Sequence, residues 1–187
     1  MDTTTNLTNN YLIAMPQLND PNFYHTATYI CEHSNDGAMG MVINRPLDLS
    51  LTEVLEQMNI CVQDESLAEV PVYSGGPVQE ERGFVLHRPA NKWESTVTIT
   101  SELAITTSKD ILMNIAEGKG PEQYLVALGY AGWGAGQLER ELSENAWLCG
   151  PADLSIMFKE PTGKRWEKAA QLMGVDLNLL SGDAGHA

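Results

Sequence analysis

YLVALGYAGW, residues 124–133, is the most apolar strand candidate in the chain, and it decides how the other segments are arranged. A continuous run of leucine, valine, alanine and aromatic residues is typical of a strand that is buried on both faces. Glycines follow it, and GQLEREL at 136–142 then predicts a short helix. We therefore expect this strand to lie at the centre of a sheet.

Two earlier stretches, GMVINRP at 40–46 and GFVLHRP at 83–89, share four of their seven residues. Each is predicted to be a strand that returns after a short polar loop. SNDG at 34–37 supplies the first loop, because Asp-Gly favours a tight hairpin turn. Both copies therefore predict the second arm of a hairpin, the later one pairing with a strand at 71–76. Proline cannot donate to a strand ladder, so the last residue of each motif is expected to end its strand.

Hairpins dominate the first hundred residues, and helices come later. The segment SLTEVLEQM at 50–58 has a capping box of Ser50 and Glu53 and an apolar stripe with helical spacing. The other predicted elements are strands at 10–18, 25–33, 95–100, 103–107 and 144–149, and helices at 108–118 and 164–173. This order predicts an α+β fold with a mixed, largely antiparallel sheet rather than alternating βαβ units.

The length of 187 residues suits one domain over 1–187, with 1–10 and 181–187 expected to be mobile tails. No apolar run approaches the roughly 18 residues that a membrane span needs. The polar first ten residues carry no lysine or arginine and no apolar core, unlike a secretory signal. The three cysteines are widely spaced, which fits reduced, buried thiols. These features predict a cytoplasmic protein that does not associate with membranes.

The formal net charge is −14, and it is unevenly distributed. Residues 46–81 contain eight acidic residues and no lysine or arginine. Such a surface repels polyanions, so binding to nucleic acid or to an anionic membrane is disfavoured. A helix-turn-helix with a basic recognition helix is absent as well, so we expect no direct DNA binding. The acidic segment fits either a solubilising surface or a docking face for a basic partner.

The turn after the central strand is one candidate ligand site. A strand, a glycine turn and a helix expose backbone N–H groups at the positive end of the helix, which suits a phosphate or carboxylate. The candidate residues are Gly132, Trp133, Gly134, Gly136 and Gln137. No Lys-Ser or Lys-Thr pair follows as in a P-loop, and the glycine spacing differs from the dinucleotide-binding pattern. In the alternative interpretation the glycines serve only the turn, and Trp133 fills the core.

The repeated motif is the second candidate site. Alternation along a strand places the large apolar residues and the arginine of each copy on one face, and Asn44 or His87 on the other. Arginine is always charged, so Arg45 and Arg88 must each reach a carboxylate, backbone carbonyls, water or a ligand. Two interpretations stay open: separate structural partners for each arginine, or one anion-binding cleft lined by Asn44, Arg45, His87 and Arg88.

Complete catalytic and metal-binding motifs are missing from the sequence. H-E-x-x-H and G-x-S-x-G are absent. If their strand is straight, His25 and His33 lie about 26 Å apart at ~3.3 Å per residue, too far to share a metal. We therefore predict no metal and no cofactor. Distant residues can still assemble in a fold, so the enzymatic alternative is a hydrolase with a site around His87 and the turn at 132–137.

Several stretches occur together in one known family. AMPQLNDPNF, GAMGMVINRP, YSGGPVQEERGFVLHRP, TTSKDIL and YLVALGYAGWGAGQLEREL follow an order and spacing that resembles the bacterial YqgE/AlgH family over residues 11–180. The resemblance implies a single domain with a bifurcated sheet folded into a pseudo-barrel and flanked by several helices. It implies no catalytic residues, because the family is uncharacterised, and the family name implies a link to transcriptional regulation.

Two classes of function follow from these observations. The first is a non-catalytic binding or regulatory protein that recognises a small anionic ligand or a protein partner. The second is the hydrolase outlined above. The lack of a complete catalytic motif favours the first.

Overall fold

The strand predicted at the centre of the sheet is the axis of the fold. In the computed structural model, which describes residues 5–180, it is β9 (Gln123–Gly134), and it pairs with other strands along both edges. The other strands in the described part of the chain are β1 (Asn10–Ala14), β2 (Ala27–Ser34), β3 (Gly37–Val42), β4 (Pro46–Ser50), β5 (Pro71–Ser74), β6 (Val78–Arg88), β7 (Thr96–Thr98), β8 (Ala104–Thr106) and β10 (Trp147–Pro151).

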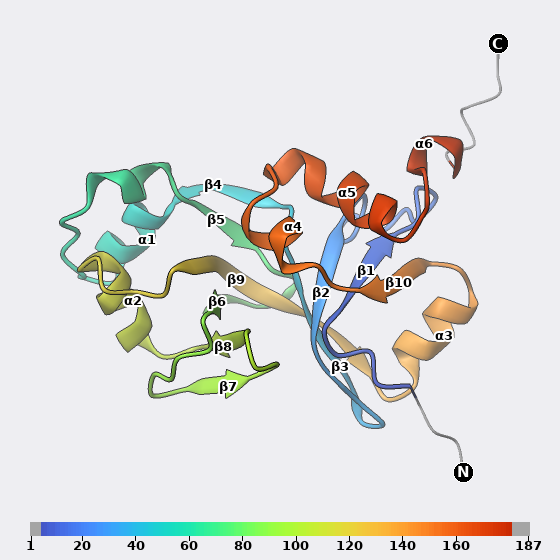
Figure 1. Cartoon of the computed structure of the whole chain (residues 1–187), viewed down its shortest axis with the longest axis horizontal. Helices are drawn as coiled ribbons and strands as arrows, with labels where there is room; N and C mark the ends of the chain where they lie inside the picture. Colours follow the sequence, from blue (N-terminus) through green and yellow to red (C-terminus); the bar gives the residue numbers. More distant parts are fainter. Residues whose placement is uncertain (1–4, 181–187) are drawn as a thin grey trace.

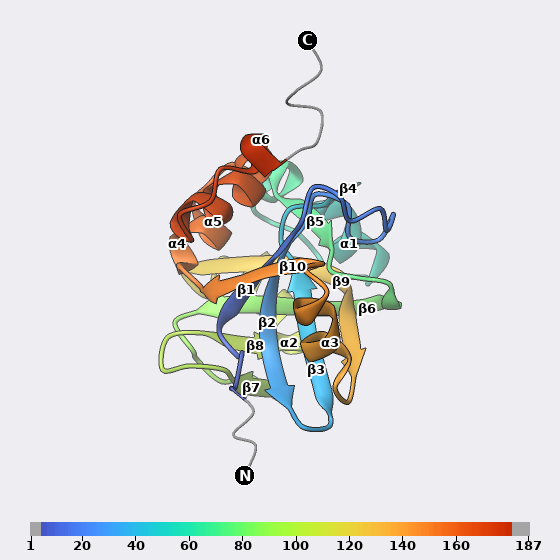
Figure 2. The ribbon, with the colours of Figure 1, turned by 90° about the vertical axis from the view of Figure 1, so that its right-hand side faces the viewer.

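The sheet has the order β10-β1-β2-β3-β9-β6-β8-β7, and it curls into a half-barrel (Figures 1 and 2). The α-helices in residues 5–180 are α1 (Leu51–Gln57), α2 (Lys109–Ala116), α3 (Gln137–Ser143), α4 (Leu154–Phe158), α5 (Arg165–Leu172) and α6 (Leu177–Leu180). In Figure 1, α1 and α2 lie at one end of the molecule and α3 at the other, with α4 and α5 between them. The predicted α+β class is confirmed. None of these helices has the length and apolar character needed to cross a membrane.

The sheet divides at β9. Along one edge, β9 pairs antiparallel with β6 from Gln123 to Tyr130. Along the other edge it pairs first with β5, in parallel at Ala127 and Leu128, and then antiparallel with β3 from Ala131 onward. Because β5 and β3 share one edge of the same strand, the sheet forks there, as the family resemblance implied. β4 extends the shorter branch by pairing with β5.

One of the two predicted hairpins is wrong. SNDG does connect β2 and β3 as an antiparallel pair, but β5 and β6 lie on opposite edges of β9 and do not pair with each other. The chain crosses over β9 at Gly75–Gly76, where a Cβ on Gly76 would lie 2.1 Å from the carbonyl carbon of Tyr130. Only glycine lets two backbones approach so closely. A glycine pair between two strand segments marks a crossing as readily as a turn.

The expected end of the first repeated strand also differs. β3 ends at Val42, and Pro46 begins β4 instead of closing β3. Ser74 N donates to Arg45 O at 2.8 Å, and β4 continues beside β5 from there. Proline is tolerated at the first residue of a strand. The chain therefore passes from β3 to β4 at Arg45–Pro46 instead of leaving the sheet there. The capping box that begins α1 is confirmed, since Ser50 and Glu53 each accept a hydrogen bond from the other's backbone N–H.

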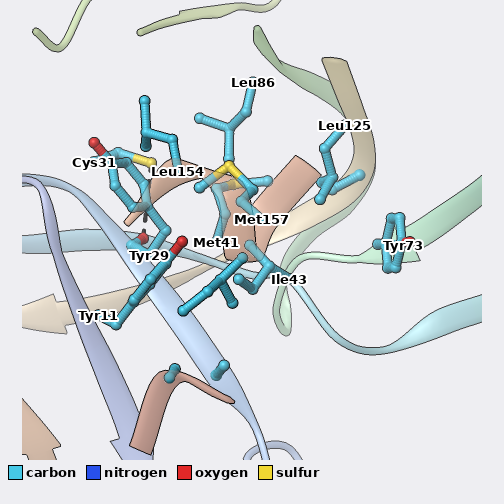
Figure 3. Close-up of a cluster of buried hydrophobic side chains, with 14 of the residues drawn as sticks. Tyr11, Tyr29, Cys31, Met41, Ile43, Tyr73, Leu86, Leu125, Leu154 and Met157 are labelled. Atoms are coloured by element: carbon cyan, nitrogen blue, oxygen red, sulfur yellow. Dashed lines mark hydrogen bonds between the residues drawn. The ribbon is translucent and has the colours of Figure 1, made fainter. Parts of the chain in front are cut away.

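The largest hydrophobic core fills the concave side of the sheet under α4 and α5 (Figure 3). The predicted apolar faces of both repeated motifs meet in it: Met41 and Ile43 from the first copy, and Phe84 and Leu86 from the second. A second core lies between the sheet and the pair α1 and α2. The two copies therefore place these four apolar side chains in one core, as the alternation predicted for them, although β3 itself ends at Val42.

The N-terminal segment joins the sheet earlier than expected. Asn9 N donates to Ile30 O at 2.9 Å, and Leu7 N donates to His33 Nδ1 at 3.0 Å. The rest of the prediction of mobile tails falls on residues 1–4 and 181–187, which lie outside the described part of the chain.

Candidate functional site

Asn44 and Arg45 hold a loop of their own chain. The guanidinium of Arg45 donates to the carbonyl oxygens of Pro21, Asn22 and Tyr24 at 2.8, 2.6 and 3.0 Å. Asn44 donates to His25 O at 2.9 Å and accepts from Ala27 N at 3.0 Å. Burial lowers the pKa of Arg45, and nearby Asp20 opposes that shift. Both side chains therefore fasten the loop that precedes β2.

Arg88, the equivalent of Arg45 in the second motif, has different surroundings. Its Nε donates to Gln123 Oε1 at 2.5 Å, and its guanidinium lies 5.8 Å from the ring centroid of Phe158. It lines an open polar cavity of 450 Å³ that contains Asp153 and Glu102 but neither Asn44 nor Arg45. The structure thus does not bring the two arginines together, and the cavity beside Arg88 carries negative charge of its own.

His87 lies at the end of a chain of hydrogen bonds. Its Nδ1 lies 3.0 Å from Pro89 O, and its Nε2 lies 2.7 Å from Thr106 Oγ1. A carbonyl can only accept, so Nδ1 carries the proton and Nε2 of the neutral ring accepts from Thr106. Thr106 in turn contacts Thr96 Oγ1 at 2.7 Å. Burial lowers the pKa of His87, which favours this neutral form, and the side chain has no exposed surface.

The glycine turn after β9 is held by a side chain of the helix that follows it. Gly136 has φ +74° and begins α3, while Gln137 Oε1 accepts from Gly134 N at 2.9 Å. The N–H group of Gly134 is therefore already occupied by a side chain, while the N-cap residue Gly136 provides no side-chain cap for α3. Trp133 is buried, with its ring 6.1 Å from that of Phe23, and Gly132 lies in the ladder with β3. The turn has the geometry of the alternative interpretation, in which it serves the fold.

Sequence reasoning missed a contact on the next helix. His33 Nε2 lies 2.5 Å from Glu139 Oε1 at the start of α3, while its Nδ1 accepts from Leu7 N. Glu139's own backbone N–H and His33 hold the pKa of that carboxyl below its usual range. Together they connect β2, α3 and the N-terminal segment. Within residues 5–180 no group of three or more His, Cys, Asp or Glu side chains is placed to hold a metal ion.

An apolar groove lies between α1 and α2, and no sequence motif pointed to it. Its main cavity has a volume of 460 Å³, and its floor consists of Val85 on β6 and Val126 and Leu128 on β9. Val54 of α1 and Met58, which caps the end of that helix, form one wall, and Leu112 of α2 forms the other. We call this cavity, together with the neighbouring one described below, the α1–α2 groove. Its size is within the range of small-molecule and peptide-anchor pockets.

Gly83 leaves the hollow in the groove floor. A Cβ built on Gly83 meets no atom within 4 Å, whereas a Cβ on Gly40, its equivalent in the first motif, would lie 2.8 Å from Thr28 Cγ2. The space beside Gly40 in the first copy is therefore filled by neighbouring atoms, whereas the space beside Gly83 in the second copy is empty. A glycine in a strand can mark close approach of another group, and this was the one signal in the sequence that could have indicated the groove.

The groove continues past its main cavity. A second cavity of 260 Å³ is lined by Ile60, Cys61 and Met113, and Lys109 lines both cavities. Met113 is 45% exposed. Glu81 borders the main cavity and Glu117 the second one. The groove therefore consists of a mainly apolar cavity and a second cavity of mixed lining, in which Asn59 and Gln63 lie beside the apolar residues.

Fold and site together define a curled-sheet α+β protein with an apolar groove between two helices. A family model described as AlgH-like matches residues 11–178. A UPF0301 protein of Thioalkalivibrio sulfidiphilus is 58% identical over 187 residues, and one of Azoarcus sp. is 52% identical over 188, each match covering 100% of both chains. The chain belongs to the AlgH-like family, which confirms the resemblance seen in its sequence.

Two solved structures have the same fold. The solution structure of the AlgH protein from Pseudomonas aeruginosa matches with a TM-score of 0.81 at 51% identity, covering 100% of this chain and 99% of that one. Protein DIP2367 from Corynebacterium diphtheriae matches with a TM-score of 0.73 at 19% identity over 97% of this chain and 94% of that one. The second likeness concerns the fold alone. Family membership leaves the activity undefined, because the relatives are themselves uncharacterised UPF0301 proteins.

Proposed function

We propose that the chain is a non-catalytic binding protein and that the α1–α2 groove is its binding surface. One observation carries this proposal: the main cavity combines an apolar floor with a hollow above Gly83, where no neighbouring atom would oppose a side chain. Apolar pockets with a few polar groups at the rim are the usual sites of ligand and peptide recognition. A cytoplasmic location and a regulatory role exerted through a partner protein are parts of the same proposal.

The partner-protein version of this proposal has more support than the small-anion version. Arg45 already donates to three backbone carbonyls, and the glycine turn after β9 binds a glutamine side chain. The cavity beside Arg88 also contains Asp153 and Glu102, whose carboxylates would repel an anion. The groove offers mainly apolar surface, which a protein segment covers readily.

The hydrolase alternative has less support from the geometry. A general base must reach the proton that it abstracts, but both ring nitrogens of His87 are engaged and its side chain is fully buried. Burial also raises the pKa of the Cys31 thiol and raises that of Cys149 to about 11, so neither thiol has the character of an activated nucleophile.

The groove can be tested with neutral apolar fragments, followed by methyl NMR of Val85, Val126 and Leu128. Gly83→Leu fills the hollow, while Gly163→Leu adds the same side chain at an open position that lines neither cavity. We expect fragments to shift these methyl signals in the wild type and in Gly163→Leu but not in Gly83→Leu. The proposal is refuted if no fragment shifts them, or if Gly83→Leu responds like the wild type.

A further inference from the structure

We infer that the α1–α2 groove receives an amphipathic helix of a partner protein, with apolar anchors on one face and lysine or arginine beside them. This inference rests on the function proposed above and adds the chemistry of the partner. Three features of the groove carry it: its two cavities, its methionine walls and the charge of the segments that build it.

The two cavities of the groove suit a helix that carries two apolar anchors. The cavities of 460 and 260 Å³ adjoin at Lys109. Apolar side chains at positions i and i+4 of a helix lie on the same face, about one turn apart. Two such anchors can enter two neighbouring cavities, one anchor in each.

The walls of the groove can adapt to a protein side chain. Met58 lines the main cavity and Met113 the second one, where it is 45% exposed. Methionine is unbranched and polarisable, and it is common on surfaces that accept apolar anchors of varied shape. The exposed position of Met113 has no core-packing role to explain it.

The charge of the surrounding segments selects a basic partner. β4, α1 and the first part of β6 form one side of the groove, and all of them belong to residues 46–81, which contain eight acidic residues and no lysine or arginine. Glu81 borders the main cavity directly, and Glu117 borders the second one. Among the described residues that line the two cavities Lys109 is the one basic residue, and Arg82 lies beside the main cavity, where it donates to the lining residue Thr107 at 3.4 Å. A cationic helix is therefore attracted to the rim, and an anionic one is repelled.

The test uses two synthetic helical peptides with leucine at i, i+4 and i+7. Lysine occupies the remaining positions near the leucine face in one peptide, and glutamate occupies them in the other. Binding is measured by fluorescence anisotropy at low and high salt. We expect the lysine peptide to bind more tightly than the glutamate peptide, and the difference to shrink as salt screens the charges.

Variants separate the charge from the apolar surface. Glu81→Gln should weaken binding of the lysine peptide about twofold to fivefold, and Lys109→Gln should strengthen it by a similar factor. Glu144→Gln removes an exposed carboxylate at the far end of α3 and should have no effect. Gly83→Leu should abolish binding while Gly163→Leu preserves it.

The outcomes distinguish this inference from the function on which it rests. If both peptides bind alike, and Gly83→Leu still blocks them, the groove is a binding surface but the choice of a basic partner is wrong. If neither peptide binds while neutral fragments do, the inference of a helical occupant is wrong. If neither peptides nor fragments bind, the proposed function itself is refuted.

Discussion

Replacing Arg45 with alanine tests the interpretation that this arginine serves the fold. The guanidinium donates three hydrogen bonds to backbone carbonyls of the loop before β2, at 2.6 to 3.0 Å. Backbone bonds within the same loop, from Phe23 N and Tyr24 N to Asp20 O, complete a short turn. Without the guanidinium, this turn loses three bonds to the segment between β3 and β4, and the bonds of Asn44 to His25 and Ala27 still hold the loop.

The expected loss of stability follows from those bonds. Hydrogen bonds from a charged group contribute about 1.5–3 kcal/mol each when buried, but Arg45 is only partly buried, and water can replace part of each bond. We take about 1 kcal/mol per bond and expect Arg45→Ala to lower the free energy of unfolding by about 2–3 kcal/mol. For a chain of this size that corresponds to a melting temperature lower by about 5–10 °C.

Thermal and denaturant unfolding measure the global effect, and hydrogen exchange at the amides of Phe23, Tyr24 and Thr26 measures the local one. Arg82→Ala is the matched control, because that arginine is exposed and its hydrogen bonds are 3.3 and 3.4 Å long; its loss should cost less than about 0.5 kcal/mol. A stability of Arg45→Ala equal to that of Arg82→Ala, with unchanged exchange in the loop, would refute the structural role.

Three further predictions test other parts of the fold. Gly76→Ala should lower the free energy of unfolding by at least about 4 kcal/mol, because its Cβ would overlap the Tyr130 backbone. Gly118→Ala is the control: Gly118 also has a positive φ, but no atom lies near its Cβ position, so the same denaturant titration should show a loss of about 1–2 kcal/mol. Burial lowers the pKa of His87, so the unfolded state binds more protons and stability should fall as pH drops below about 6.5; His87→Gln should flatten that part of the pH profile. Arg165 is buried and donates to Ile43 O at 2.5 Å, so Arg165→Lys, which lacks the planar fork, should cost about 2 kcal/mol by chemical denaturation.

Local signals predicted the elements that local physics forms. Residues 124–133 contain no charged side chain that would require one face of the strand to be exposed to solvent, and β9 lies between strands on both sides. The capping box of α1 and the Asp-Gly turn between β2 and β3 are set by neighbouring residues, and both are present. The missed strand β4 starts at a proline and has an exposed pattern, so neither periodicity nor burial distinguishes it from a loop.

The error at Gly75–Gly76 has a physical cause. A hairpin and a crossing both need glycine, the first for its dihedral angles and the second for close approach of two backbones. The partner in the crossing is β9, whose contact residues Gly129 and Tyr130 lie more than fifty positions later in the chain. No local pattern specifies such a distant contact. For the same reason the sequence could not show that Arg45 and Arg88 lie apart. Their motifs are equivalent, but distant parts of the chain give each arginine different neighbours.

The hollow over Gly83 can be tested for whether the fold itself requires it. A Cβ there meets no atom within 4 Å, and the residue has no positive φ, so stability alone does not call for glycine. A leucine at 83 would raise strand propensity and cover apolar floor, and we expect Gly83→Leu to unfold at equal or higher denaturant than the wild type, by up to about 1 kcal/mol. Gly40→Leu, where the space is filled, should be strongly destabilised. If Gly83→Leu is instead destabilised like Gly40→Leu, the fold itself requires that glycine. The hollow over Gly83 is then explained by stability and no longer supports a binding role for the groove.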